Sequence, residues 1–256
     1  VRRVSVVMLS RSFAVAFVLS VFSSSALAQP APTGVIGDGS GAVTGVLLLA
    51  HGGQPQWNER VVEVARRVNE QHPAEVAFGM ATRANIQSAV DKLTARGVTE
   101  IVAVPLFVSS HSSVITSTEY LLGLRKEAPK DLAIFAKMNH APHGAPADEH
   151  APHVTADPAS PITTSAPVRI TPAFNRHAII GAIAADRALS ISTSPPSESV
   201  ILVAHGPVPD EDNRRWLEDM TVLAAHIARA APFASVEYMT VRDDAGPAIR
   251  EAATNE

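Results

Sequence analysis

The chain has 256 residues, of which 46% are hydrophobic and 18% are charged, and its formal net charge is −4. This composition is typical of a globular protein long enough for one large domain or two small ones. No run of Lys and Arg stands out, so we expect no nucleic-acid partner. The absence of cysteine excludes disulfides and thiolate metal sites, and leaves His, carboxylate, Met or backbone ligands for any transition metal.

Residues 1–28 have the plan of a secretory signal peptide. Arginines precede and flank a short apolar stretch at residues 13–22, and Ala26 and Ala28 then supply a small-residue cleavage site. The apolar stretch is shorter than the ~20 residues that a membrane span needs. We therefore expect an exported protein, periplasmic or secreted, with no membrane span in the mature chain. An uncleaved N-terminal anchor is the alternative.

Residues 29–44 are rich in Gly, Ala, Pro and Ser and predict a flexible leader. Apolar runs and amphipathic segments then alternate through a first lobe, residues 45–138. The predicted strands are 45–50, 75–81, 100–108 and 132–138, and the predicted helices are 58–71, 85–97 and 114–128. Continuous apolar strands that alternate with helices indicate a parallel sheet flanked by helices.

Residues 139–167 interrupt this alternation with a segment dense in Pro, Ala and His, which predicts a linker of low order. Its spacing H-x2-H-x6-H-x2-H suits loose capture of Zn²⁺, Ni²⁺ or Co²⁺, and a solvated linker without a role is the alternative. The histidines of this accessory tract are His140, His143, His150 and His153.

Residues 168–256 repeat the pattern of the first lobe. We predict strands at 168–174, 200–204 and 235–241 and helices at 176–190, 211–230 and 245–254. "VLLLAHGG" and "VILVAHGP" place His51 and His205 after matched strands, and residues 76–83 match residues 236–243. We therefore expect two α/β lobes with parallel sheets, related by an internal repeat and an approximate twofold. The second lobe is expected to be incomplete, without a third strand.

Two histidines follow predicted strands of the first lobe, where ligands bind in parallel α/β sheets. His51 follows the first strand, and His111 follows the third. Gly52 and Gly53 allow a sharp turn and a close ligand. Two neutral imidazoles suit Co²⁺, Ni²⁺, Fe²⁺ or Zn²⁺, or serve as proton acceptors. A single strand-end histidine is more often a turn residue, but a pair with one member duplicated favours a site.

At these residues the chain resembles a known family. "LLLAHGG" with "VPLFVSSH" is similar to the class II chelatases, the sirohydrochlorin cobaltochelatase and ferrochelatase group. The resemblance implies insertion of a divalent metal, with cobalt expected and iron or nickel as alternatives, into a tetrapyrrole without a nucleotide. It implies that His51 and His111 bind the metal and accept pyrrole protons, and that Gly52, Gly53 and Ser110 border the macrocycle. Monomer and homodimer are both left open.

The chain departs from the family pattern at the second strand. The family usually has a glutamate there, and this chain has Met80, with Thr240 at or near the matching place in the second lobe. Glu119 is the nearest carboxylate downstream of His111. The alternative to an enzyme is therefore an exported metal- or tetrapyrrole-binding protein that kept the fold without turnover. An α/β-hydrolase is excluded because no G-x-S-x-G elbow is present.

Overall fold

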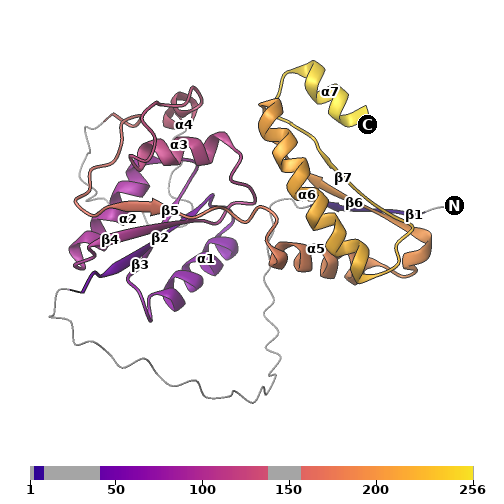
Figure 1. Ribbon diagram of the computed structural model, residues 1–256, viewed down its shortest axis with the longest axis horizontal. Coiled ribbons are helices and arrows are strands. Elements are labelled where there is room, and N and C mark those ends of the chain that lie inside the picture. Colours follow the sequence, from indigo (N-terminus) through magenta and orange to yellow (C-terminus); the bar gives the residue numbers. More distant parts are fainter. Residues whose placement is uncertain (1–2, 9–40, 138–156, 256) are drawn as a thin grey trace, which may run out of the picture.

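The computed structural model describes residues 3–8, 41–137 and 157–255, which form two parallel sheets (Figure 1). The first sheet has the strand order β3-β2-β4-β5, and the second has the order β1-β6-β7. Every described strand pair is parallel. The predicted α/β class, with parallel sheets flanked by helices, is confirmed.

The first lobe follows the predicted alternation closely. Its strands are β2 (Thr44–Ala50), β3 (Ala74–Phe78), β4 (Glu100–Pro105) and β5 (Val168–Ile170). Its helices are α1 (Pro55–Val68), α2 (Arg83–Ala95), α3 (Ser113–Leu121) and α4 (Leu132–Lys137). The core forms because side chains of a strand alternate between the two faces of a sheet. Leu47 and Leu49 point to the face covered by α2, α3 and α4, while Figure 1 shows α1 on the opposite face.

Two predictions about the end of the first lobe are wrong. Residues 132–137 form helix α4 and not a strand: Leu132 and Phe135 are buried, while Ile134 between them is exposed. This spacing of three residues is helical. The fourth strand is instead β5, which pairs with β4 through Ile101 and Val168. Residues 168–170 therefore belong to the first sheet, although the sequence pattern placed them in the second lobe.

Part of the expected linker lies against the first lobe. The Arg83 guanidinium donates to the carbonyls of Ser160 and Pro161, at 2.9 and 3.2 Å. Ile162 packs on the core, and Ala166 is buried. The residues from 157 onward are therefore a structural part of this lobe, because a buried arginine takes its hydrogen-bond acceptors from them.

The second lobe contains the second sheet and the last helices. Its elements are α5 (Ala178–Ile191), a short 3₁₀ helix (Pro195–Ser197), β6 (Glu198–Ala204), α6 (Asp210–Ala230), β7 (Ser235–Thr240) and α7 (Pro247–Asn255). Val200 and Leu202 of β6 pack against α5 and α6. The core of this lobe is therefore built on the face of the sheet that these two helices cover.

The N-terminal strand β1 (Arg3–Met8) pairs with β6 on the side away from β7. In the first sheet, the corresponding side of β2 is occupied by β4. The segment RVSVVM is rich in β-branched residues, which favour a strand wherever an unpaired edge is open. Residues 3–8, which the sequence pattern placed within a signal peptide, thus pair with β6 in the structure.

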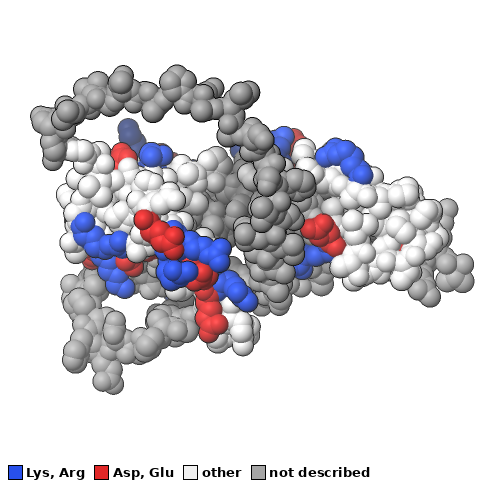
Figure 2. Space-filling model, turned by 90° about the horizontal axis from the view of Figure 1, so that it is seen from below, with Lys and Arg blue, Asp and Glu red and all other residues white. Residues whose placement is uncertain are grey.

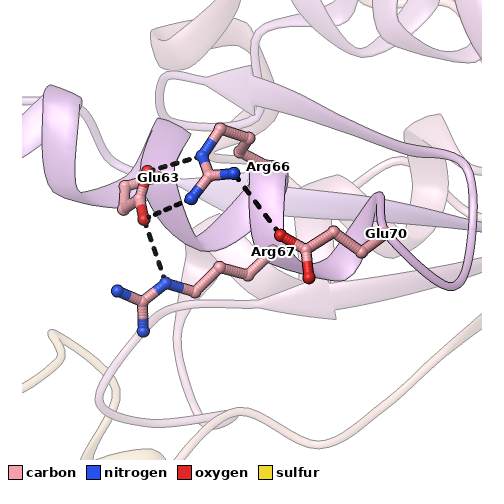
Figure 3. Close-up of polar contacts among 4 residues, drawn as sticks. All are labelled: Glu63, Arg66, Arg67 and Glu70. Carbon is pink, nitrogen blue, oxygen red and sulfur yellow. Dashed lines mark hydrogen bonds and ion pairs between the residues drawn. The ribbon is translucent and has the colours of Figure 1, made fainter.

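The described surface carries mixed charge. Figure 2 shows acidic and basic side chains interspersed on one face, without a broad patch of one sign. On α1, Glu63 pairs with Arg66 and Arg67, and Arg66 also reaches Glu70 (Figure 3). Hydrogen bonds from Arg66 and then Arg67 lower the pKa of Glu63 to about 2. These side chains are well exposed, so they form a solvated helix face and contribute little to stability.

Among the described helices, none has both the length and the apolar character required to cross a membrane.

Candidate functional site

His51 and His111 leave the same edge of the first sheet. β2 and β4 are hydrogen-bonded neighbours, with Leu49 opposite Pro105 near their carboxyl ends. His51 follows β2 directly, and His111 lies in the loop between β4 and α3. The parallel pairing therefore brings the two predicted site segments to one end of the sheet, where ligands bind in this class of fold.

The turn after β2 fixes the hydrogen position on the His51 ring. Nδ1 of His51 lies 2.8 Å from the carbonyl oxygen of Gly52. A carbonyl only accepts hydrogen bonds, so Nδ1 must carry the hydrogen, and a neutral ring then has its lone pair on Nε2. The His51 side chain is exposed. Its Nε2 is therefore available to a metal ion or a proton.

His205 repeats this geometry in the second lobe. Its Nδ1 lies 2.8 Å from the carbonyl oxygen of Gly206. Gly52 and Gly206 both have positive φ, at 83° and 74°, a conformation that glycine adopts without strain. Nε2 of His205 lies 3.5 Å from Oδ2 of Asp244, which makes an ion pair when the ring is protonated.

Gly53 has a different role from Gly52. Its N–H donates to Oδ1 of the buried Asn58, at 2.9 Å, which ties the turn to the first part of α1. A Cβ added at Gly53 would come no closer than 3.8 Å to the ring of Trp57. The backbone turn therefore requires glycine at position 52 and not at position 53, and the expected approach of a ligand to Gly53 stays a prediction.

The His111 loop is held by residues outside its own lobe segment. Asn175, with φ of +46°, accepts from the N–H of Ser110 through Oδ1 at 2.7 Å. The Ser110 hydroxyl accepts from the N–H of Ala173 at 2.9 Å. The Nε1–H of Trp216 donates to the His111 carbonyl at 2.6 Å. Ser110, which was predicted to border a macrocycle, therefore holds the loop in place through hydrogen bonds of its N–H and its hydroxyl oxygen.

The end of β3 carries no carboxylate. Met80 follows this strand and packs on the core of the first lobe. Thr240 was predicted to be the counterpart of Met80 in the second lobe, and the strand register shows that this is wrong. Ala50 lies opposite Phe78, and Ala204 lies opposite Thr240. Thr240 thus corresponds to Phe78, and Arg242, two residues later, corresponds to Met80. The Arg242 guanidinium binds the carbonyls of Pro207 and Val208 and the carboxylate of Asp210, which braces the turn after His205.

Glu119, the nearest carboxylate downstream of His111 in the sequence, joins no cluster of metal ligands among the described residues. Glu119 lies on α3, and its carboxylate is 4.0 Å from the guanidinium of Arg125. Within residues 3–8, 41–137 and 157–255, no three His, Asp or Glu side chains gather closely enough to hold a metal ion.

A cavity of about 100 Å³ lies between the His111 loop and the second lobe. Its walls include Val108 and Ser109 from the loop, His205 from the turn after β6, and Trp216 and Asp219 from α6. The cavity therefore lies between the first part of the His111 loop and the turn that carries His205.

The remaining histidines of the described chain have structural surroundings or lie on the surface. Nδ1 of His177 accepts from the N–H of Ile179 at 3.2 Å, which caps α5. His226 of α6 lies against Gly181 of α5. His72 is exposed. The accessory tract of His140, His143, His150 and His153 lies outside the described residues.

Several residues of the site region were not predicted from the sequence. Asn175, Trp216, Arg242 and Asp244 act through contacts between segments far apart in the chain. Asn175 and Arg242 both have positive φ, which is uncommon for residues other than glycine. Nothing local in the sequence signals these contacts, although an isolated Trp early in an amphipathic helix could have been singled out.

The strand-end histidines, the parallel sheet and the matched segment together define a class of protein. Residues 45–138 match the CbiX family. The first lobe is therefore similar to the CbiX family over these residues.

Two curated relatives are sirohydrochlorin cobaltochelatases. The protein of Methanothermobacter thermautotrophicus is 31% identical over 83 residues, which cover 31% of this chain and 58% of the relative. The protein of Methanococcoides burtonii is 31% identical over 87 residues, which cover 32% of this chain and 66% of the relative. The chain thus spans roughly three fifths to two thirds of these relatives. No solved structure matches the chain.

Proposed function

We propose that the first lobe inserts a divalent metal into a sirohydrochlorin-type tetrapyrrole. Cobalt is the metal proposed first, with iron and nickel as alternatives, and the names of the two relatives support this choice. The observation that carries the proposal is the placement of His51 and His111 after two paired strands of a lobe that matches the CbiX family model. No nucleotide is required in this proposal.

The proposed chemistry uses imidazole nitrogens as ligands and bases. Nε2 of His51 carries the lone pair, so it can hold the incoming metal or accept a proton. Insertion forms bonds from the metal to pyrrole nitrogens and breaks two pyrrole N–H bonds. The two protons leave through neutral imidazoles, His51 and His111, and then pass to water. Gly52, Gly53 and Ser110 are proposed to border the macrocycle.

The first prediction tests these roles by substitution. His51→Ala and His111→Ala should each lower the rate of Co²⁺ insertion into sirohydrochlorin by about a hundredfold or more, because proton transfer and metal positioning are both lost. The rate is followed by the absorbance change of the macrocycle. Thermal stability should change little, because the exposed ring of His51 contributes little to the core. His72→Ala, an exposed histidine after α1, is the matched control and should keep the wild-type rate.

A binding protein without turnover is the second candidate function. Met80, in the place where the family usually has a glutamate, favours it, because no carboxylate at the end of β3 can assist metal or proton handling. Wild-type protein that binds Co²⁺ and sirohydrochlorin but never joins them would support this candidate and contradict the enzyme.

We also propose that the two lobes are copies of one unit. Both lobes have a His-Gly turn after a central strand, with the same Nδ1 contact to the glycine carbonyl. In both, the residue directly after the neighbouring strand, Gly79 or Val241, donates its N–H to the carbonyl of the alanine before the histidine. His205→Ala is expected to lower the insertion rate much less than His51→Ala, because no counterpart of His111 lies within residues 168–255 of the second lobe.

Export is proposed from residues 1–28, which have the plan of a signal peptide. The expected result is a periplasmic or secreted protein whose N-terminal sequence begins near Gln29. Cell fractionation with N-terminal sequencing measures both. A cytoplasmic protein that retains Arg3–Met8 would contradict export and would agree with a permanent pairing of β1 with β6.

A further inference from the structure

We propose that Trp216, in the second lobe, is a positioning residue for His111 in the first. The inference rests on the proposed function, since it assigns His111 a place in metal insertion. The observation that carries it is a hydrogen bond between the lobes: the indole N–H of Trp216 donates to the main-chain carbonyl of His111 at 2.6 Å. The two residues are 105 positions apart, so the contact exists only when the lobes are assembled.

The second lobe holds the connecting segment as well as the loop. Asp219 lies three residues after Trp216, so both project from one face of α6. Oδ1 of Asp219 accepts from the Arg176 guanidinium at 2.9 Å, and the Asp219 side chain is only 7% exposed. Arg176 follows Asn175, which binds the N–H of Ser110. Helix α6 therefore contacts the His111 loop in two ways. Trp216 binds it directly, and Asp219 binds Arg176, whose neighbour Asn175 binds Ser110 of the loop.

The His111 loop has room to move if the hydrogen bond from Trp216 is lost. The cavity of about 100 Å³ is bounded by Val108 and Ser109 of the loop on one side and by Trp216 and Asp219 on the other. Without the indole donor, the His111 carbonyl loses its partner, and the loop can relax into the cavity. The imidazole is attached to the same residue, so its position relative to His51 changes as well. Displacements of about 1 Å at a reacting group lower rates by as much as a hundredfold.

The test is Trp216→Phe, which removes the N–H donor and keeps most of the apolar ring. The turnover number for Co²⁺ insertion into sirohydrochlorin should fall on the order of tenfold or more, with the KM for sirohydrochlorin unchanged. Thr221→Val is the matched control on the same helix. It removes a hydrogen bond to the Tyr238 hydroxyl, of 2.7 Å, that lies within the second lobe, and it should keep the wild-type turnover number.

A double-mutant cycle and a spectrum separate positioning from a general loss of structure. Trp216→Phe should add nothing to His111→Ala, because its effect passes through that ring, and should add its full effect to His51→Ala. Long-range ¹H–¹⁵N NMR of the imidazoles should show a shifted or broadened His111 signal in Trp216→Phe, with the His177 signal unchanged.

The outcomes distinguish this inference from the proposed function. An active wild type with full turnover in Trp216→Phe, or an unaltered His111 signal in that variant, would overturn the positioning role and leave the proposed function standing. An inactive wild type whose His111 signal changes in Trp216→Phe would overturn the proposed function and support the positioning role.

Discussion

The carbonyl of the following glycine determines which ring nitrogen carries the hydrogen in His51 and in His205. The carbonyls of Gly52 and Gly206 bind Nδ1 of His51 and His205, and this contact leaves the lone pair of a neutral ring on Nε2. The two rings differ in what faces that nitrogen. Asp244 lies 3.5 Å from Nε2 of His205, and no such contact is found for His51 among the described residues. The surroundings of Nε2 therefore differ between the two lobes, although the turns match.

Glu198 gives a residue-scale prediction about pH. Its buried carboxylate accepts from the Ser192 hydroxyl at 2.6 Å and from the N–H groups of Thr193 and Ser194, both at 3.0 Å. These bonds, led by that from Ser192, lower its pKa from 4.5 to about 2. A lowered pKa in the folded state means that the carboxylate stabilises the fold above the unfolded value, and that this contribution is lost as pH falls from about 4.5 to about 2.

Glu198→Gln should therefore unfold more easily than wild type at neutral pH, and the difference should shrink below about pH 4.5. Urea unfolding at a series of pH values measures it. Glu237→Gln, an exposed position on β7, is the control and should change stability little. A difference that stays constant down to about pH 2 would show that the loop contacts do not depend on the charge.

The sequence predicted the positions of His51, His111 and His205 because each follows an apolar strand, and such strands are recognised from composition alone. It did not predict Asn175, Arg242 or Trp216, because their roles come from contacts over 32 to 105 positions. Thr240 was matched to Met80 from the sequence similarity of residues 76–83 and 236–243, whereas the hydrogen-bond register matches Thr240 to Phe78.

At the scale of the elements, helices α5 and α6 cross closely where Gly181 meets His226. A Cβ added at Gly181 would lie 2.5 Å from Cγ and Cδ2 of the His226 ring, a distance that forces a shift. We predict that Gly181→Ala lowers the free energy of unfolding by about 1–3 kcal/mol through overpacking. Chemical denaturation measures this loss.

Gly246→Ala is the control, because an added Cβ there meets nothing within 4 Å. Combining Gly181→Ala with His226→Ala should recover part of the loss, since the clashing ring is removed. No recovery would show that the glycine is needed for the helix backbone and not for the crossing.

The elements that were misread are short. Residues 132–137 form α4, but six residues with several apolar side chains fit a strand as well as a helix turn. β5 has three residues, and its place beside β4 depends on the return of the chain after residue 157. Long elements such as α6, with 21 residues, were predicted almost to the residue because their apolar spacing is sustained.

At the scale of the whole molecule, the segment between α4 and β5 divides into two parts. Residues 157–167 pack on the first lobe through Ile162, Ala166 and the acceptors of Arg83. We predict that replacing residues 139–156 by a Gly/Ser segment of equal length leaves far-UV circular dichroism and the thermal midpoint unchanged, because few large apolar side chains are lost.

The same replacement removes His140, His143, His150 and His153, so the number of Co²⁺ ions bound per chain should fall, as measured by equilibrium dialysis. Metal insertion at saturating Co²⁺ should persist. Ile162→Ala is the contrasting variant and should lower the thermal midpoint, because its side chain packs on the core. Unchanged metal binding after the replacement would leave the tract with a linker role only.

Because Trp216 is hydrogen-bonded to His111, its fluorescence can report on the surroundings of this histidine. The chain has two tryptophans. Trp216 contacts the His111 carbonyl, and Trp57 lies close to Gly53, two residues after His51. Each indole thus reports from one side of the region where metal and macrocycle are expected to meet. Paramagnetic Co²⁺ quenches nearby indole emission, and a bound tetrapyrrole absorbs it. Comparison of the wild type with Trp57→Phe, which retains Trp216, would therefore reveal in which order the two sides of the site are filled, without any added label.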